Sequence, residues 1–119
     1  MRFNIQEQGA VSIVTVSGEF TMLDDPQKFV DVLKGLLEKG HSQLVINLNI
    51  NYVDSTGMGK LVQAFKLVRD HGGRMVFVNP GPKARETIKL TRFDQLFSFY
   101  DSVEAAVQGL EAGPAPLST

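Results

Sequence analysis

The sequence contains no cysteine, no tryptophan and only two histidines, and it has no long hydrophobic run. Without cysteine the chain cannot form disulfide bonds or thiolate metal sites, which is compatible with a reducing compartment. Its longest apolar stretches are a few residues, whereas a membrane-spanning helix needs about 20, and no signal-peptide core follows Met1. These absences predict a cytoplasmic protein that does not enter a membrane.

An excess of charge of either sign is also missing. Twelve Lys and Arg residues against 13 Asp and Glu residues give a formal net charge of −1. Domains that bind nucleic acid or anionic membranes carry a basic patch, and this composition predicts none. We therefore expect a protein or small-molecule partner, with no direct nucleic-acid contact. The 119 residues, 43% of them hydrophobic, are enough for one globular domain with a single core.

The spacing of apolar residues predicts five strands and four helices in the order ββαβαβαβα. The strands are expected near residues 2–8, 11–16, 44–48, 74–78 and 96–100, and the helices near 25–39, 55–70, 83–91 and 102–112. Glycine and proline in 113–116 end the last helix. The domain is therefore expected to span 1–112, followed by a loosely held tail at 113–119.

The lengths of the connections predict the topology. Only Gln8, Gly9 and Ala10 separate the first two strands, and so short a link favours an antiparallel hairpin. The later strands alternate with helices, which favours right-handed crossovers between parallel neighbours. The predicted fold class is α/β: a single mixed sheet with the first two strands antiparallel, the later strands largely parallel, and about four helices packed mainly on one side.

The segment between the second strand and the first helix combines apolar and acidic residues. Phe20, Met22 and Leu23 are large and apolar, so each is either part of the core or, if exposed, part of a contact surface. Asp24 or Asp25 before Pro26 is a helix-start signal. Helix capping explains this pair of carboxylates more simply than catalysis does.

The most unusual stretch is Asp54-Ser55-Thr56-Gly57-Met58-Gly59-Lys60, which joins the third strand to the second helix. Asp54 or Ser55 can cap that helix. Each glycine disfavours a helix interior by about 1 kcal/mol relative to alanine, so a stability argument does not select two of them. Without side chains at Gly57 and Gly59, another backbone, an anion or a partner protein can approach the helix tip. The alternative interpretation is that glycine only lets the turn pack against a neighbouring strand.

Two catalytic interpretations of this stretch fail. A phosphate-binding P-loop needs a glycine five positions before its Gly-Lys pair and a Ser or Thr after it, but Asp54 and Leu61 occupy these places. A hydrolase needs a base beside Ser55. His71 lies about 24 Å along the same predicted helix, and His41 precedes the third strand at its far end. We therefore predict no catalytic residue, no cofactor and no metal site.

One chemistry remains for Ser55. A serine at a helix N-terminus, beyond the carboxyl end of a strand, stands where open α/β sheets bind ligands, and its hydroxyl is expected to face solvent. Such a serine can accept a phosphoryl group, which adds about −1.5 to −2 charges at neutral pH. The helix dipole tolerates that charge, whereas a partner docked against the same surface would be repelled. The sequence therefore predicts a binding switch and no enzyme.

The whole order of elements resembles a STAS domain, specifically a bacterial anti-sigma factor antagonist. Residues 14–19, Val-Thr-Val-Ser-Gly-Glu, resemble the family's second strand and its Gly-Glu pair. Residues 51–59, Asn-Tyr-Val-Asp-Ser-Thr-Gly-Met-Gly, resemble its Asp-Ser-Ser/Thr-Gly-Leu-Gly motif. The Gly-Gly turn at 72–73 and the segment 93–97 also fit. The central motif is fairly specific, and the other segments support it by their order.

The resemblance implies partner switching. In this family the unphosphorylated antagonist binds an anti-sigma factor that is itself a serine kinase, and so frees a sigma factor. The kinase phosphorylates the serine after the motif aspartate, and a phosphoserine phosphatase restores it. Carried over, Ser55 is the acceptor and Thr56 the neighbouring hydroxyl. The docking surface would comprise Asp54, Thr56, Gly57, Met58, Gly59 and the loop residues Glu19, Phe20, Thr21, Met22 and Leu23.

Two departures from the family pattern bear on the partner. Many members have an aspartate where this chain has Thr21, and Pro80-Gly81-Pro82 stands where polar capping residues are usual. Two rival functions stay open at this level. One is a STAS subunit of another assembly, such as a signalling or lipid-transport complex, in which Ser55 is never phosphorylated. The other is a nucleotide-binding or hydrolytic module.

Overall fold

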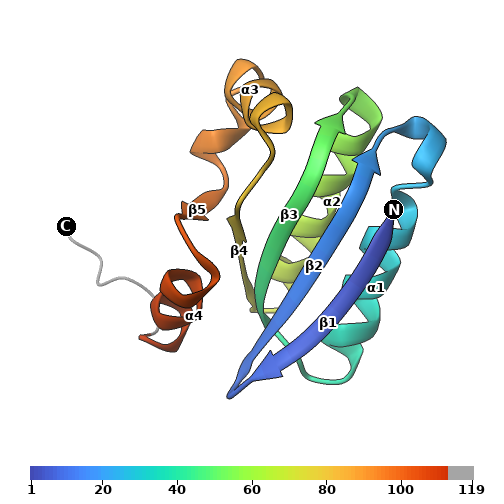
Figure 1. The fold of residues 1–119 in the computed structure, drawn as a ribbon. Coiled ribbons are helices and arrows are strands. Elements are labelled where there is room, and N and C mark those ends of the chain that lie inside the picture. The colour runs from blue at the N-terminus through green and yellow to red at the C-terminus, as the bar shows by residue number, and fades with distance from the viewer. Residues whose placement is uncertain (113–119) are drawn as a thin grey trace.

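The structure is a computed structural model that describes residues 1–112, so the predicted tail at 113–119 lies outside the described residues. Its strands are β1 (Arg2–Gln8), β2 (Val11–Phe20), β3 (Gln43–Val53), β4 (Arg74–Val78) and β5 (Ser98–Tyr100). Its helices are α1 (Gln27–Glu38), α2 (Ser55–Asp70), α3 (Pro82–Leu90) and α4 (Val103–Glu111), with short 3-10 helices η1 (Met22–Asp24) and η2 (Phe93–Gln95). Figure 1 shows the arrangement.

The strands form one sheet in the order β1-β2-β3-β4-β5. β1 and β2 are antiparallel and joined by a tight turn at Gly9, whose φ of 62° suits glycine. β2, β3, β4 and β5 pair in parallel. The predicted mixed sheet, with its antiparallel first pair, is therefore confirmed.

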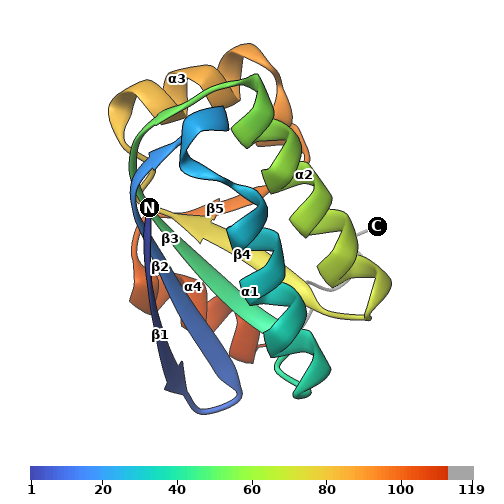
Figure 2. The same cartoon turned by 90° about the vertical axis from the view of Figure 1, so that its right-hand side faces the viewer.

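Helices cover both faces of this sheet. Figure 2 shows α1 and α2 in front of it and α4 behind it. Alternate residues of the central strands face the two sides: Val14, Ile46 and Phe77 pack with α1 and α2, whereas Ile13, Val45, Val76 and Val78 pack with Ala106, Val107 and Leu110 of α4. Because both faces are covered, these strands carry buried apolar residues on both sides. The fold class is as predicted, with the two longest helices on one side and α4 on the other.

β2 and β3 are longer than the sequence predicted. They pair in parallel as far as Phe20 and Val53, with a bulge between Gly18 and Phe20. Phe20 is therefore a strand residue and fully buried, with its ring edge-on to Phe29 of α1 at 5.5 Å. The sequence predicts Phe20 in a loop, because hydrophobic pattern alone does not mark where strand pairing ends.

The predicted start of the first helix was wrong. The residue before α1 is Pro26, which makes no side-chain capping bond, and the helix begins at Gln27. Asp24 belongs instead to η1, where its carboxylate accepts hydrogen bonds from Thr21. Asp25 then turns the chain in the left-handed region with φ of 53°. The acidic pair thus shapes the turn before the helix, and neither residue caps it.

The Pro80-Gly81-Pro82 segment presses the start of α3 against β3. A Cβ atom on Gly81 would lie 2.4 Å from the carbonyl oxygen of Ile50, so only glycine fits at this position. Pro82 occupies the first turn of α3, where a missing N–H costs nothing. The departure from the family pattern therefore replaces a polar cap by close backbone packing.

Candidate functional site

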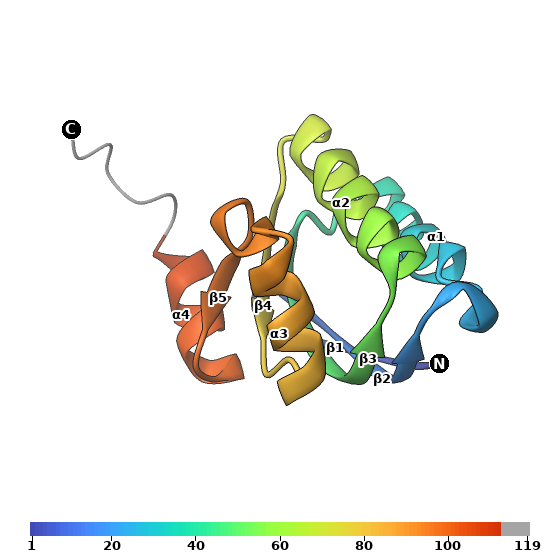
Figure 3. The same ribbon diagram turned by 90° about the horizontal axis from the view of Figure 1, so that it is seen from above.

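The candidate site lies at the edge of the sheet where β2 and β3 end. Seen from above in Figure 3, η1, the start of α2 and the whole of α3 gather at this edge. In sheets with parallel strands and helical crossovers, ligands and partners bind beyond the carboxyl ends of the strands. The motif 54–60 therefore stands where the topology leaves room for recognition.

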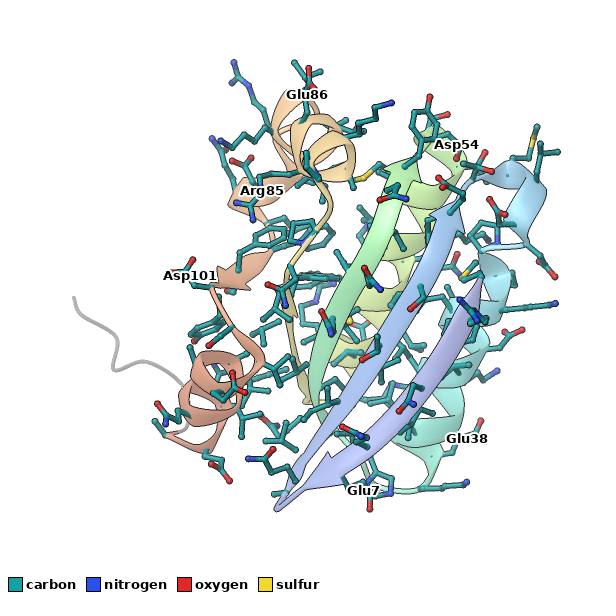
Figure 4. The ribbon with its side chains drawn as sticks, in the orientation of Figure 1. Glu7, Glu38, Asp54, Arg85, Glu86 and Asp101 are labelled. Atoms are coloured by element: carbon teal, nitrogen blue, oxygen red, sulfur yellow. The ribbon has the colours of Figure 1, made fainter. Side chains whose placement is uncertain are left out.

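Asp54 organises this edge through its two carboxylate oxygens. Oδ1 accepts a hydrogen bond of 2.8 Å from the N–H of Gly57, which caps α2. Oδ2 accepts one of 2.9 Å from the N–H of Met22, in η1. Figure 4 shows Asp54 at the end of β3, beside the connection from β2 to η1. One side chain thus holds the η1 segment next to the tip of α2, one residue from Ser55.

η1 is a hydrogen-bonded turn that exposes two apolar side chains. Thr21 and Asp24 form a capping box: the N–H and the hydroxyl of Thr21 donate to Asp24 Oδ2 at 3.0 and 2.6 Å. The Thr21 hydroxyl, followed by its N–H, holds the pKa of the Asp24 carboxyl below its ordinary value. Met22 and Leu23 remain 66% and 90% exposed. Large apolar side chains that a hydrogen-bonded turn keeps exposed to solvent are typical of a contact surface.

The two glycines of the motif do different things. A Cβ atom on Gly57 would lie 2.0 Å from the Phe20 carbonyl oxygen and 2.9 Å from the Val53 side chain, so Gly57 is required for packing α2 against β2 and β3. The plain packing interpretation is therefore correct for Gly57. Gly59 is exposed, and a Cβ atom there would meet nothing within 4 Å. Only Gly59 leaves the surface of the helix tip bare.

Ser55 and Thr56 are the first two residues of α2, and both are exposed. Their N–H groups have no acceptor inside the helix, because the first turn of any helix lacks one. The positive end of the helix dipole lies at the same place. The Ser55 hydroxyl is thus reachable by another protein and stands where added negative charge is tolerated.

A groove of about 460 Å³ runs beside Ser55. One wall is the end of β3 and the tip of α2, and the other comes from α3 and η2; the lining residues are Tyr52, Val53, Asp54, Ser55, Met58, Gly59, Thr87, Thr91 and Phe93. Asp54 is the acidic residue among them, and no Lys or Arg of the described chain lines the groove. A phosphoryl group on Ser55 would therefore find no cation within the groove to neutralise it.

The structure sorts the predicted docking residues by exposure. Glu19, Met22, Ser55, Thr56 and Gly59 are exposed, and Thr21 and Asp54 are half-buried. Phe20, Gly57 and Met58 are buried, with Phe20 and Met58 at 0% and 2% exposure. These three residues hold the tip of α2 onto the sheet, and Met58 also lines the groove, so their part in a docking surface stays a prediction.

Sequence reasoning missed the far wall of the groove. Thr87 lies in α3, Thr91 follows its last residue and Phe93 begins η2. They line the same groove as Ser55 because α3 packs against β3. Thr87 and Thr91 are one helical turn apart, a spacing visible in the sequence, but nothing local relates them to Ser55. Tyr52, which is 50% exposed, belongs to the motif at residues 51–59, and the sequence predicted no role for it.

The histidines lie far from this groove, as predicted. His71 ends α2 at the opposite end from Ser55, with Nδ1 2.9 Å from the Leu67 carbonyl oxygen. His41 lies 3.1 Å from the Glu7 carboxylate. Residues 1–112 contain no group of three or more His, Cys, Asp or Glu side chains placed to hold a metal ion. Within the same range, no helix has the length and apolar character needed to cross a membrane.

Comparison with known proteins agrees with this architecture. The family model of the STAS domain matches residues 2–106. The chain belongs to the STAS domain family. An anti-sigma-B factor antagonist of Bacillus subtilis is 26% identical to this STAS protein over 95 residues, covering 80% of this chain and 86% of the relative.

Solved structures share the fold. A candidate anti-sigma factor antagonist of Thermotoga maritima superposes with a TM-score of 0.83 at 23% identity, covering 92% of this chain and 94% of that one. SpoIIAA, an anti-sigma factor antagonist of Bacillus, is similar in its unphosphorylated form, with a TM-score of 0.69, 16% identity and coverage of 95% and 100%. Its phosphorylated form gives a TM-score of 0.66 at 15% identity, with coverage of 90% and 97%. At these identities the likeness concerns the fold alone.

Proposed function

We propose that this STAS protein is an anti-sigma factor antagonist switched by phosphorylation of Ser55. In the unphosphorylated state it binds an anti-sigma factor that is a serine kinase, and so releases a sigma factor. Phosphorylation of Ser55 by that kinase ends the binding, and a phosphoserine phosphatase restores it. The observation that carries the proposal is an exposed serine at the first position of α2, beside the exposed apolar residues of η1.

Ser55 is the better acceptor of the two neighbouring hydroxyls. It lines the groove between α2 and α3, whereas Thr56 does not. The groove gives a kinase a concave surface on which to position the hydroxyl for transfer. In the transfer, the serine oxygen bonds to the γ-phosphorus of ATP, the bond to the β-phosphate oxygen breaks, and the hydroxyl proton passes to a base of the kinase. This chain supplies the nucleophile and its position.

The fold is expected to survive the modification. A phosphate at the first residue of α2 faces unpaired N–H groups and the positive end of the helix dipole, both of which favour an anion. The groove side of Ser55 is open, so the three added oxygens need displace no core residue. The existence of SpoIIAA, a protein of the same fold, in both forms supports this expectation.

The surface, in contrast, changes completely. Before modification, the groove contains the carboxylate of Asp54 and no basic residue, so a partner meets a small and weakly charged patch. Phosphorylation adds about −1.5 to −2 charges to that patch. A partner packed against Met22, Leu23 and Ser55 would then bury an unpaired phosphate, which is unfavourable because of both desolvation and repulsion from Asp54.

The docking surface follows from the exposed residues of the edge. Met22 and Leu23 supply apolar contact area. Glu19 at the end of β2 and Thr21 at the start of η1 precede them in the chain, and Gly59 leaves room on the first turns of α2. A cytoplasmic location belongs to the proposal, because the kinase consumes ATP. Ser55 and its surroundings serve as substrate and binding surface for other proteins, with no catalytic role in this chain.

The test uses the kinase-type anti-sigma factor encoded in the same genome. Ser55→Ala is expected to bind it like the wild type, and Ser55→Asp at least tenfold more weakly. Ser55→Asn is the matched control, because it has nearly the size of Ser55→Asp without the charge and is expected to bind like Ser55→Ala. Equal affinities for Ser55→Ala and Ser55→Asp would refute the switch and favour a STAS subunit of another assembly.

A second experiment identifies the acceptor directly. After incubation with the kinase and ATP, mass spectrometry of wild type and Thr56→Ala is expected to show one phosphate on Ser55, and Ser55→Ala none. Addition of a phosphoserine phosphatase is expected to remove it and to restore binding. Phosphate on Thr56 alone, or no phosphate on wild type, would contradict the proposal.

A further inference from the structure

A separate pocket of about 290 Å³ lies between α3, η2 and β5. Its lining residues are Pro80, Arg85, Ile88, Lys89, Asp94, Phe97 and Phe99. At about 100° per residue along α3, Arg85 and Lys89 are on the opposite side of this helix from Thr87 and Thr91. The pocket is therefore distinct from the groove beside Ser55, and it lies beside β5, with Phe99 within that strand and Phe97 directly before it.

The inner part of this pocket is aromatic and packs against the core. The Phe97 and Phe99 rings lie with their centroids 6.4 Å apart and their planes inclined at 65°. Phe97 is buried and packs against Phe77 in the core at 4.7 Å, so the wall cannot easily move aside. Ile88, also buried, closes the side toward α3. This surface suits a flat apolar group, because aromatic rings pack well edge-to-face or offset.

The rim of the pocket carries two positive charges. Arg85 and Lys89 are one turn apart on α3, a spacing at which like charges destabilise a helix slightly. Within residues 1–112, neither side chain makes a salt bridge or a hydrogen bond to a carboxylate. Figure 4 shows Arg85 on the side of α3 toward β5 and Glu86 on the side away from it. Both cations are thus free for an external anion.

Asp94 is the third charged group of the lining and lies on η2. Two cations and one carboxylate leave the lining at a net charge of +1. Asp94 would repel a bound anion, so the anionic group of a ligand belongs at the Arg85 and Lys89 side and its apolar body against Phe97 and Phe99. Pockets with an apolar interior and a few placed polar groups are the usual form of small-molecule sites.

We propose that this pocket binds a small organic anion, a carboxylate with an aromatic body, with the carboxylate at Arg85 and Lys89 and the ring against Phe97 and Phe99. Binding is non-covalent and involves no reaction. It does not depend on phosphorylation of Ser55, so either proposal can fail without the other.

The test titrates 3-phenylpropionate and its uncharged amide, 3-phenylpropionamide, into the full chain and follows backbone amide signals by NMR. The carboxylate is expected to shift the signals of α3 and of residues 94–99, with a dissociation constant on the order of 1 mM for so small a ligand. The amide is expected to bind at least threefold more weakly. Shifts confined to other parts of the chain, or equal affinity for both compounds, would overturn the proposal.

Charge variants give the decisive comparison. Arg85→Gln and Lys89→Gln are each expected to weaken carboxylate binding about two- to fivefold and to leave the amide unaffected. Asp94→Asn is expected to strengthen carboxylate binding by a similar factor, because it removes the repelling charge. Lys28→Gln, a matched change on the exposed side of α1, is expected to have no effect. Indifference of the carboxylate to all three pocket variants would refute the assignment.

Discussion

Asp54 accepts a hydrogen bond from the backbone N–H of Met22, a residue 32 positions earlier in the chain. The same carboxylate caps α2, so the position of the η1 turn and the start of the helix are set by one side chain. An aspartate that looks in the sequence like an ordinary helix cap therefore also builds the candidate docking surface. This double role can be tested through stability.

Asp54→Ala is expected to lower the free energy of unfolding by about 2–3 kcal/mol, since it removes a helix cap and a second hydrogen bond to Met22. Asp54→Asn, which keeps one acceptor oxygen, is expected to cost about 1 kcal/mol. Urea denaturation measures both. Glu86→Ala, at an exposed site on α3, serves as the control and is expected to stay within about 0.5 kcal/mol of wild type. A similar stability for Asp54→Ala and Glu86→Ala would contradict this role.

The two motif glycines are expected to respond in opposite directions to the same substitution. Gly57→Ala forces a methyl group onto the Phe20 carbonyl oxygen and is expected to destabilise the fold by about 3 kcal/mol or more. Gly59→Ala meets nothing within 4 Å and is expected to stabilise it by about 0.5–1 kcal/mol through helix propensity. The unfolding temperatures of the two variants, measured with that of the wild type, test this prediction. If Gly59→Ala destabilises the protein, the absence of a side chain at Gly59 is also required for the fold.

Negative charge at Ser55 is expected to leave the fold intact. Ser55→Asp should change the free energy of unfolding by between zero and about +1 kcal/mol, because the helix dipole favours it and the neighbouring Asp54 opposes it. Gln108→Asp places the same charge in the last turn of α4 and is expected to destabilise by about 0.3–1 kcal/mol. A loss of more than about 1 kcal/mol in Ser55→Asp would show that phosphorylation unfolds the tip of α2.

The capping box in η1 predicts that the stability of the folded state depends on pH. The Thr21 hydroxyl, and then its N–H, lower the pKa of Asp24 in the folded state. A carboxyl with a depressed folded pKa contributes stability above its unfolded pKa of about 3.9, and this contribution disappears as the pH falls through the folded pKa. Thr21→Val removes the larger cause, so an NMR titration of Asp24 is expected to give a higher pKa than in wild type. An unchanged pKa would show that the hydroxyl does not hold the carboxylate in solution.

The exposed apolar residues of η1 are expected to contribute to partner binding and little to stability. Leu23→Ser and Met22→Ser should each weaken binding to the kinase-type anti-sigma factor by about tenfold, the effect of removing a well-packed apolar contact. Ile5→Ser is the control, because Ile5 is 46% exposed on the edge strand β1, away from the site. If the Ile5 variant loses as much affinity as the Leu23 variant, the docking surface lies elsewhere.

Much of this architecture could be predicted from the sequence. The hairpin before Val11, the stop of α2 at His71 and the cap at Asp54 all follow from residues within a few positions of one another. Turn residues and apolar spacing act locally, because a helix or a tight turn is decided by its own backbone hydrogen bonds. The position of Ser55 as the first residue of α2, directly after the cap, follows in the same way.

Tertiary structure alone decided which motif residues face outward. Phe20 and Met58 are apolar and lie beside the docking surface in sequence, yet both are in the core, whereas Leu23 is almost fully exposed. The difference arises because β2 and β3 pair as far as Phe20 and Val53, which brings the tip of α2 down onto Phe20. The far wall of the groove at Thr87 and Thr91 is likewise set by how α3 packs across β3. Such contacts join residues distant in the chain, and no local pattern encodes their distance.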